Sequence, residues 1–303
     1  MKPTTRSLAV LAILLGVSGC SSMGGSLFDT ALNVASDPNK RAAVQQTVEA
    51  VQTASQEITA EQEYYIGRAV AANILATRKA YSEQTATDYL NVLGRSLSLY
   101  SDRPETFGGY HFLIMDSDEI NAFAAPGGLI LISRGLLRCA DSEETVAAIL
   151  AHEISHVVLK HGLKAISNAR WTAAVQAGVN AGVQVAGSRE LKQLTGAFKD
   201  SINDITNTLV NSGYSREQEL QADQMALVIM RKAGYDPQAF DEMLTVMKSK
   251  LKPGGADFAK THPDPQVRIT AVEKTLSGQP AVAVNPTAAN ARQARYGTAV
   301  GAI

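Results

Sequence analysis

Two histidines and a glutamate stand together in His-Glu-Ile-Ser-His at residues 152–156. Side chains four residues apart share one face of a helix, so His152 and His156 can direct two imidazole nitrogens at one ion. Zinc binds such nitrogens at about 2.0–2.1 Å. Glu153 lies one step round the helix, where we expect it to contact metal-bound water rather than the metal. The metal ion lowers the pKa of that water. The spacing is the HExxH pattern of zinc metallopeptidases.

The surrounding sequence predicts the helix that must position these groups. Asp141 and Glu144 match a capping box, and an apolar run follows until His161 and Gly162, where we expect the helix to end. Imidazoles embedded in such an apolar helix need partners. This favours a metal site over a helix that simply carries two histidines and an acid on its surface.

A catalytic zinc site usually has three protein ligands and one open position. No histidine stands six residues after His156, which excludes a three-histidine site of the metzincin type. The candidates for the third ligand are therefore His161, His262 or a carboxylate. His161 lies about half a turn away from His152 on the helix, so we expect it to interact with the helix C-terminus instead.

A second predicted helix, over about 215–233, supplies carboxylates with suitable spacing. Glu219 and Asp223 are four residues apart and share a face. One of them can bind the metal while the other accepts the spare N–H of a ligand histidine. The ordinary alternative is a charged helix surface, which we expect for Glu217 because it lies two residues off this face.

Short strands are predicted just before the HExxH helix, and further helices on both sides of it. We therefore expect the α+β fold class, predominantly helical, with a small three-stranded sheet beside the HExxH helix. The expected strands cover 109–116, 119–125 and 129–133, with a Pro-Gly-Gly turn before the last, and the other helices cover 59–79, 83–100, 237–251 and 265–277.

Four sequence motifs follow one another along the chain: NAFAAPGGLILISRGLL, HEISHVVLKH, SREQELQAD and THPDPQVRI. Together they resemble the gluzincin zinc metallopeptidase family of BepA, LoiP, HtpX and the CAAX-prenyl endopeptidases, over about residues 57–277. The resemblance implies a zincin-type peptidase domain with one Zn²⁺ and protein or peptide substrates. It makes Glu219 the third zinc ligand, Asp223 its supporting partner and Glu153 the general base. No transmembrane helix is predicted after the N-terminus, so the soluble periplasmic lipoprotein branch, closest to LoiP, fits best.

The strand with Asn121, Ala122, Phe123 and Ala124 precedes the Pro-Gly-Gly turn. In zinc peptidases with HExxH helices, an edge strand pairs with an extended substrate backbone and positions the scissile carbonyl. We expect these four residues to form that substrate strand. The alternative is a simple core hairpin.

His262 and Arg268 belong to a segment that two prolines stiffen, Thr-His-Pro-Asp-Pro-Gln-Val-Arg at 261–268. By resemblance to the family, this segment returns to the rim of the active site. We expect His262 to hydrogen-bond the oxyanion or to occupy the open metal position in a resting form, and Arg268 to neutralise developing charge. The alternatives are a loop-fixing histidine and a surface salt bridge.

Residues 1–19 predict a lipoprotein signal peptide, because the apolar run at 8–17 is too short to span a bilayer. Val-Ser-Gly-Cys at 17–20 resembles a bacterial lipobox, so Cys20 is expected to carry lipid and anchor the chain. By resemblance to bacterial lipoproteins, Ser21 after the cysteine favours the periplasm at the inner face of the outer membrane, where assembly machinery is a candidate partner. The alternatives are an ordinary cleaved signal and an uncleaved inner-membrane anchor.

The rest of the chain divides by composition. Residues 20–56 predict a tether with an N-terminal helix, 57–277 the zinc metallopeptidase domain, and 278–303 a flexible tail. The uncharged stretch 171–188 has a polar stripe every four residues, which favours an amphipathic helix over a membrane helix. The longer segment 163–214 is a candidate lid over the site.

Composition narrows the class of function. The 28 basic and 29 acidic side chains leave a formal charge of −1, with no basic excess for nucleic acid. Cys139 stands in an apolar stretch and predicts an inert buried thiol. The sequence therefore predicts a lipid-anchored periplasmic zinc endopeptidase acting on misfolded or unassembled envelope proteins. The alternative is an outer-membrane assembly factor or chaperone whose zinc site is structural or latent, with His262 in the fourth position.

Overall fold

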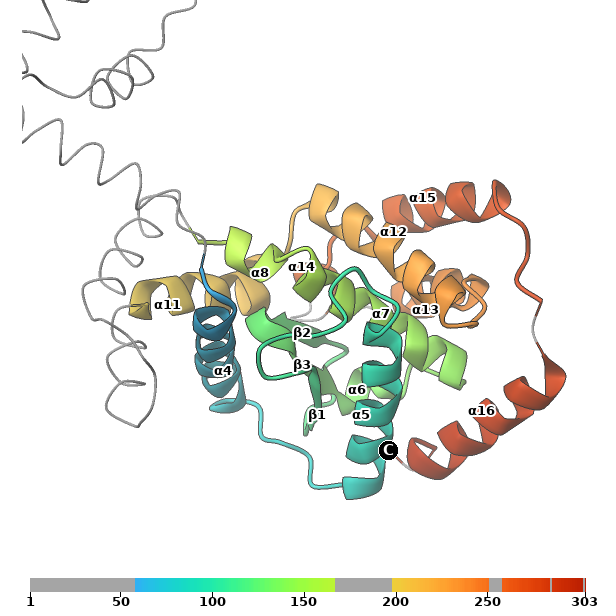
Figure 1. Cartoon of the computed structure of the whole chain (residues 1–303), viewed down its shortest axis with the longest axis horizontal. Coiled ribbons are helices and arrows are strands. Elements are labelled where there is room, and N and C mark those ends of the chain that lie inside the picture. The colour runs from blue at the N-terminus through green and yellow to red at the C-terminus, as the bar shows by residue number, and fades with distance from the viewer. Residues whose placement is uncertain (1–57, 167–197, 251–257, 284, 302) are drawn as a thin grey trace, which may run out of the picture. The chain divides into compact units, whose positions relative to one another are not determined.

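Helix α7 (Glu143–Val158) runs through the centre of the computed structural model, with the other elements arranged around it (Figure 1). The structure describes residues 58–166, 198–250, 258–283, 285–301 and 303, all of them within the unit Ile58–Ile303. Nearly every side chain of α7 is buried, as the unbroken apolar sequence around the HExxH pattern requires. The helix therefore carries its polar residues into the protein interior.

The sheet has three strands, β1 (His111–Met115), β2 (Ala122–Ala125) and β3 (Leu129–Ser133). Their order is β1-β3-β2, with β1 parallel and β2 antiparallel to the central β3. The 3₁₀ turn η1 (Pro126–Gly128) joins β2 to β3. Gly127 has a φ of 76°, and a Cβ there would lie 2.7 Å from Cα of Tyr64, so only glycine fits.

Successive side chains of a strand point to opposite faces of the sheet, so the hydrophobic core is divided between the two faces. Ile130 and Ile132 of β3 pack in the cluster that includes α7, whereas Leu131 between them packs in the cluster that includes helix α4 (Ala60–Leu75). Both faces of β3 are therefore buried, which explains why its sequence is continuously apolar rather than alternating.

Helices cover both faces of the sheet. Helix α12 packs along α7, and α5, α13 and α16 also contact α7, while α4 contacts η1, β2 and β3. The helices are α4 (Ala60–Leu75), α5 (Gln84–Ser98), α6 (Arg134–Leu137), α8 (His161–Lys164), α11 (Lys199–Asn207), the π-helix η2 (Thr208–Ser212), α12 (Arg216–Lys232), α13 (Gln238–Lys250), α14 (Phe258–Thr261), α15 (Pro265–Ser277) and α16 (Pro286–Ala299).

This architecture confirms the predicted α+β class, predominantly helical, with a small three-stranded sheet beside the HExxH helix. The predicted capping box at Thr59 and Gln62 is present at the start of α4. At α7 the predicted cap was wrong: Ser142 caps the helix by accepting from the Thr145 N–H, so the helix begins one residue later than Asp141 would allow.

The segment 278–303, for which the sequence predicts a flexible tail, contains helix α16. Asn285 caps this helix and Pro286 occupies its first turn, two start signals that the weak hydrophobic period obscured. Arg295 donates to both carboxylate oxygens of Glu143, at 3.1 and 2.6 Å, and Tyr296 donates to the backbone carbonyl of Ala140. The helix is therefore held to the start of α7 by these polar contacts, while Tyr296 and Ala299 at its C-terminal end pack against the apolar core.

Glu143 is only 1% exposed, and two further side chains donate to it. The hydroxyls of Tyr89 and Tyr235 lie 3.3 and 2.9 Å from its carboxylate oxygens. A buried carboxylate needs such partners because desolvation disfavours its charge. The first turn of the HExxH helix is thus fixed by residues from α5, from the loop after α12, and from α16.

Cys139 is buried and free, and its thiol donates to the backbone carbonyl of Gly135. Burial raises the pKa of this thiol, which agrees with the predicted inert cysteine. In the part of the chain that the structure describes, no helix has both the length and the apolar character needed to cross a bilayer. The predicted helix at 171–188 and most of the predicted lid lie outside the described residues.

Candidate metal centre

Helix α7 places His152, Glu153 and His156 in the interior, each about 1% exposed. The two imidazoles point the same way because they are four residues apart, and their Nε2 atoms lie 3.1 Å from each other. The ring centroids are 4.7 Å apart with the planes at 77°. The HExxH spacing thus brings two nitrogens together as predicted.

Helix α12 lies alongside and supplies the carboxylate. A capping box between Ser215 and Gln218 fixes its first turn, which sets the register of Glu219 and Asp223 one and two turns later. Both carboxylates are fully buried and face α7. Glu217 is exposed, as predicted for a residue off this face.

Glu219 is directed at both histidines. Its oxygens lie 3.5 Å from Nε2 of His152 and 3.4 Å from Nε2 of His156. Four ligands at about 2.0–2.1 Å around tetrahedral zinc would be about 3.3 Å from one another. The separations of these three donors match that requirement, and so His152, His156 and Glu219 fit a zinc ion.

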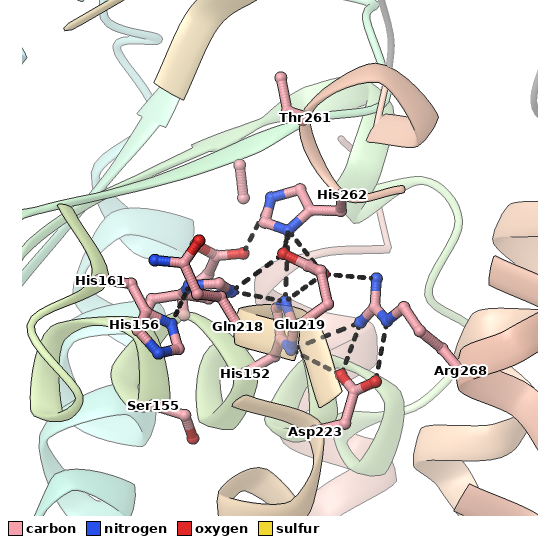
Figure 2. Close-up of polar contacts among 12 residues, drawn as sticks. His152, Ser155, His156, His161, Gln218, Glu219, Asp223, Thr261, His262 and Arg268 are labelled. Atoms are coloured by element: carbon pink, nitrogen blue, oxygen red, sulfur yellow. Dashed lines mark hydrogen bonds and ion pairs between the residues drawn. The ribbon is translucent and has the colours of Figure 1, made fainter. Parts of the chain in front are cut away.

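His262 joins the same group. Figure 2 shows the His262 ring directed at Glu219. Its Nδ1 lies 3.3 Å from Nε2 of His152 and 3.1 Å from Oε1 of Glu219. Candidate ligand atoms of His152, His156, Glu219 and His262 all lie within 4.8 Å of one another, and all four residues are buried. The loop between α14 and α15 therefore brings a fourth donor to the place where a metal ligand belongs.

The shape of that loop follows from its sequence. Asp264 adopts a left-handed conformation with φ 57°, and Pro265 begins α15 with its fixed φ. Thr261, next to His262, donates to the amide oxygen of Asn121 at 3.0 Å and accepts at its carbonyl from the Tyr214 N–H. The loop is thus tied to β2 on one side and to the start of α12 on the other.

Asp223 and Arg268 support the ligands from behind. Asp223 Oδ1 lies 3.0 Å from Nδ1 of His152, while Nε and Nη2 of Arg268 donate to the two Asp223 oxygens at 2.8 and 2.7 Å. Nη1 of Arg268 lies 2.9 Å from Oε2 of Glu219. The contact between Asp223 and His152 orients the imidazole and increases its basicity as a ligand.

Arg268 is 0% exposed, so the alternative of a surface salt bridge is wrong. Its guanidinium lies between two buried carboxylates, Glu219 and Asp223 (Figure 2). A planar fork of donors suits this bidentate arrangement better than a lysine would. The predicted role in neutralising charge on the substrate stays a prediction, since these contacts are with ligand-side carboxylates.

The structure places His161 differently from the sequence analysis. Helix α7 ends at Val158, and Lys160 takes a left-handed conformation with φ 54°, so the chain turns before His161. Nδ1 of His161 then lies 3.0 Å from Nδ1 of His156, and its Nε2 lies 3.2 Å from Oε1 of Gln221. His161 is not among the four grouped candidate ligands, as predicted, but it contacts His156 and Gln221 rather than the helix C-terminus, because the helix ends before it.

Gln221 and Tyr214 were missed altogether. The Tyr214 ring stacks on His156 with centroids 4.0 Å apart and planes at 18°, which restrains one face of the imidazole. The only signal in the sequence was position, because Tyr214 directly precedes the Ser215 cap. Gln221 lies two residues from Glu219 and carried no signal.

In the absence of metal, the two ligand histidines have different pKa values. Burial and the charge of Arg268 oppose protonation of His152, but hydrogen bonds to Asp223 and Glu219 outweigh them and raise its pKa to about 9. Burial, followed by the charge of His152, holds the pKa of His156 well below its usual range. Burial favours neutral Glu219, yet His262 and Arg268 lower the pKa of its carboxyl well below normal. The site therefore holds a carboxylate beside one neutral and one protonated imidazole.

Glu153 is held in a different environment. Neither of its carboxylate oxygens has a hydrogen-bond partner among the described residues, although the side chain is 1% exposed. Burial raises the pKa of its carboxyl. Oε1 of Glu153 lies 3.8 Å from Nε2 of His262, beyond hydrogen-bond distance. A buried carboxylate that accepts no hydrogen bond within the protein is suited to contact a water molecule or substrate.

The predicted substrate strand is at the edge of the sheet, because β2 pairs only with β3 among the described strands. Ala122, Phe123 and Ala124 belong to β2, and Asn121 directly precedes it. All four are buried, with at most 3% of each exposed. η2 contacts β2, so this edge is covered in the structure.

An HExxH helix, a small sheet beside it and a glutamate ligand on a following helix define a zinc metallopeptidase of the gluzincin class. The chain belongs to peptidase family M48, whose model matches residues 84–276. This confirms the predicted family, the enzyme class of a zinc metalloendopeptidase and Zn²⁺ as the cofactor.

Three curated relatives show the range of the similarity. The "Beta-barrel assembly-enhancing protease" of Escherichia coli (strain K12) is 25% identical over 215 residues, which is 69% of this chain and 42% of the relative. "Metalloprotease LoiP" of the same strain is 28% identical over 166 residues, 55% of this chain and 59% of the relative. "Mitochondrial metalloendopeptidase OMA1" of Schizosaccharomyces pombe is 31% identical over 162 residues, which is 52% of this chain and 43% of the relative. The chain thus spans about half the length of these relatives.

Several expectations stay predictions. The lipid on Cys20 and the tether lie outside the described residues, and the domain boundaries are not tested by the fold. The catalytic roles of Glu153, His262 and Arg268 and the substrate role of β2 rest on position alone.

Proposed function

We propose that this chain is a lipid-anchored periplasmic zinc endopeptidase that cleaves peptide bonds in misfolded or unassembled envelope proteins. The observation that carries the proposal is the buried carboxylate of Glu153, which neighbours the fitted zinc ligand His152 along α7, has no hydrogen-bond partner among the described residues, and lies 3.8 Å from Nε2 of His262. The lipobox-like sequence ending in Cys20 supports the anchor, and relatives named for β-barrel assembly support the class of substrate.

His152, His156 and Glu219 would hold the zinc ion. Zinc in such a site polarises the scissile carbonyl and lowers the pKa of the attacking water. Glu153 accepts a proton from that water as its oxygen attacks the carbonyl carbon. The same proton passes from Glu153 to the leaving nitrogen as the C–N bond breaks, so the carboxylate is regenerated.

The surrounding residues keep this geometry. Asp223 orients His152, and the His161 ring contacts the Nδ1 side of His156. We propose that Arg268 is a positioning residue, because it holds Glu219 and Asp223 in place through three short contacts. β2 would receive the extended substrate once the elements that cover it move aside.

The test is digestion of casein and of an unfolded outer-membrane protein by the purified zinc-loaded chain. Glu153→Gln is expected to abolish cleavage while keeping zinc stoichiometry and thermal stability. Glu105→Gln, an exposed and matched change, is expected to leave cleavage intact. Cleavage that survives Glu153→Gln would refute the mechanism. For the anchor, palmitate labelling is expected in the wild type and absent in Cys20→Ala.

A second candidate function is an assembly factor or chaperone with a latent or structural zinc site. The position of His262 favours it, since a fourth donor close to His152 and Glu219 closes the open metal position. Latency predicts that His262→Ala raises peptidase activity. If no form cleaves protein and Glu153→Gln still complements a deletion strain, the assembly role replaces the peptidase role.

A further inference from the structure

The hydroxyl of Tyr214 has no place in the function described so far. The side chain is 5% exposed, and the oxygen has no hydrogen-bond partner among the described residues. The ring itself is well fixed, because it stacks on His156 and lies 6.0 Å from the His262 ring. The backbone N–H of Tyr214 donates to the carbonyl of Thr261 at 3.0 Å, so the residue is held from both sides.

A buried hydroxyl without a partner destabilises a folded protein, because the water it loses is not replaced. Phenylalanine would make the same stacking contact with His156 without that cost. The oxygen of Tyr214 therefore needs an acceptor that is absent from the resting protein and arrives with a ligand.

A second group without a hydrogen-bond partner belongs to the same site. Neither oxygen of Glu153 accepts a hydrogen bond in the described structure, although Oε1 lies 3.8 Å from Nε2 of His262. The Tyr214 ring lies 6.0 Å from the same His262 ring, so the phenol and the Glu153 carboxylate both lie near His262 without hydrogen-bonding to each other. A ligand that satisfies both must present an acceptor to Tyr214 and a donor to Glu153. A peptide carbonyl and the water that attacks it have this arrangement of groups.

We propose that the Tyr214 hydroxyl donates a hydrogen bond to the scissile carbonyl oxygen and stabilises the negative charge that develops there. This inference rests on the proposed peptidase function. As the water oxygen bonds to the carbonyl carbon, the carbonyl π electrons move onto oxygen and strengthen the hydrogen bond from Tyr214. When the C–N bond breaks, the electron pair returns, and Glu153 delivers the proton to nitrogen. Tyr214 keeps its own proton throughout.

Tyr214→Phe isolates the oxygen because it keeps the ring and its stacking on His156. We expect kcat to fall about 100-fold with KM unchanged, as for loss of one oxyanion donor. The affinity of the zinc-loaded chain for a phosphinic peptide, which presents a tetrahedral oxyanion, is expected to fall by a similar factor. The affinity for the matched amide peptide, measured in a Glu153→Gln background, is expected not to change.

Tyr110→Phe is the matched control. Tyr110 is equally buried, but its hydroxyl donates to the backbone carbonyl of Arg103 at 2.9 Å. We expect this control to lower the melting temperature and leave kcat unchanged. Tyr214→Phe is expected to leave the melting temperature unchanged or raise it, because the oxygen it removes has no partner in the resting protein.

Three results would overturn the assignment: a kcat within threefold of wild type, unchanged affinity for the phosphinic peptide, or loss of zinc in Tyr214→Phe. The last would make Tyr214 a support for His156. If the wild type cleaves no peptide, the proposed peptidase function fails, and phosphinic-peptide binding still decides the role of Tyr214. If Glu153→Gln is inactive while Tyr214→Phe matches the wild type, only this inference fails.

Discussion

Arg268 provides the sharpest test of how the ligands are held. Its guanidinium is fully buried between Glu219 and Asp223, with three nitrogen–oxygen contacts of 2.7–2.9 Å. Arg268→Gln removes the positive charge and leaves two buried carboxylates close together. Breaking a buried ion pair from one side costs about 3–5 kcal/mol. We therefore expect the metal-free variant to lose about that much of its free energy of unfolding.

In a domain of this size, such a loss lowers the melting temperature by roughly 6–20 °C, at about 2–4 °C per kcal/mol. Zinc should reduce the difference, because the cation replaces part of the missing positive charge beside Glu219. Urea denaturation with EDTA and with excess zinc measures both quantities.

Arg216→Gln is the matched control. Arg216 forms an ion pair of 2.7 Å with Asp264, but the two side chains are 62% and 39% exposed. Exposed pairs contribute at most about 1 kcal/mol because solvent screens them. If Arg268→Gln costs no more than Arg216→Gln, or if zinc leaves its cost unchanged, our explanation of the buried arginine is wrong.

Two further predictions concern protons and the C-terminal helix. In the metal-free protein the pKa of His152 is raised to about 9 from 6.5, so its proton stabilises the fold fully below pH 6.5, and that contribution is lost as pH rises through about 9. Zinc must displace this proton when it binds His152. Titration calorimetry in buffers of different ionisation heat should therefore detect the release of about one proton per zinc ion at pH 7. Zinc binding without proton release would contradict the protonated state of His152. Arg295→Gln removes the bidentate cation from Glu143 and should lower the free energy of unfolding, measured by urea denaturation, by about 1–2 kcal/mol. The expected loss is this small because Arg295 is 55% exposed and solvent screens the ion pair. An unchanged urea midpoint would show that the hydroxyls of Tyr89 and Tyr235 are enough to stabilise Glu143.

The metal ligands and Asp223 could be predicted because they fall into two pairs, and the two residues of each pair lie close together in the sequence on one helix. His152 and His156 on one helix, and Glu219 and Asp223 on another, are oriented by the 3.6-residue period alone. The sequence also predicted the β3 strand at 129–133 with its observed limits, since a short apolar run ends there at Ser133, which caps the next helix. Such patterns need no knowledge of distant neighbours.

Contacts between distant segments could not be predicted in this way. His161 reaches His156 only because Lys160 takes a left-handed conformation, and lysine gives no signal for that backbone. Gln221 and Tyr214 become part of the site only when α12 packs on α7. Helix α16 was missed because its apolar contacts, made by Tyr296 and Ala299, are confined to its C-terminal end, and arginine side chains make other contacts with the protein.

The attachment of α16 has a consequence for the order in which the protein matures. Glu143 and Arg295 are separated by 152 residues, yet they meet in the first turn of the helix that carries the HExxH residues. Contacts so distant in sequence close late in folding because the intervening loop is long. Until Arg295 reaches it, the buried carboxylate has Tyr89 and Tyr235 as donors but no cation. We therefore expect the first turn of the HExxH helix to gain its charge balance late in folding, after the local contacts along that helix have formed.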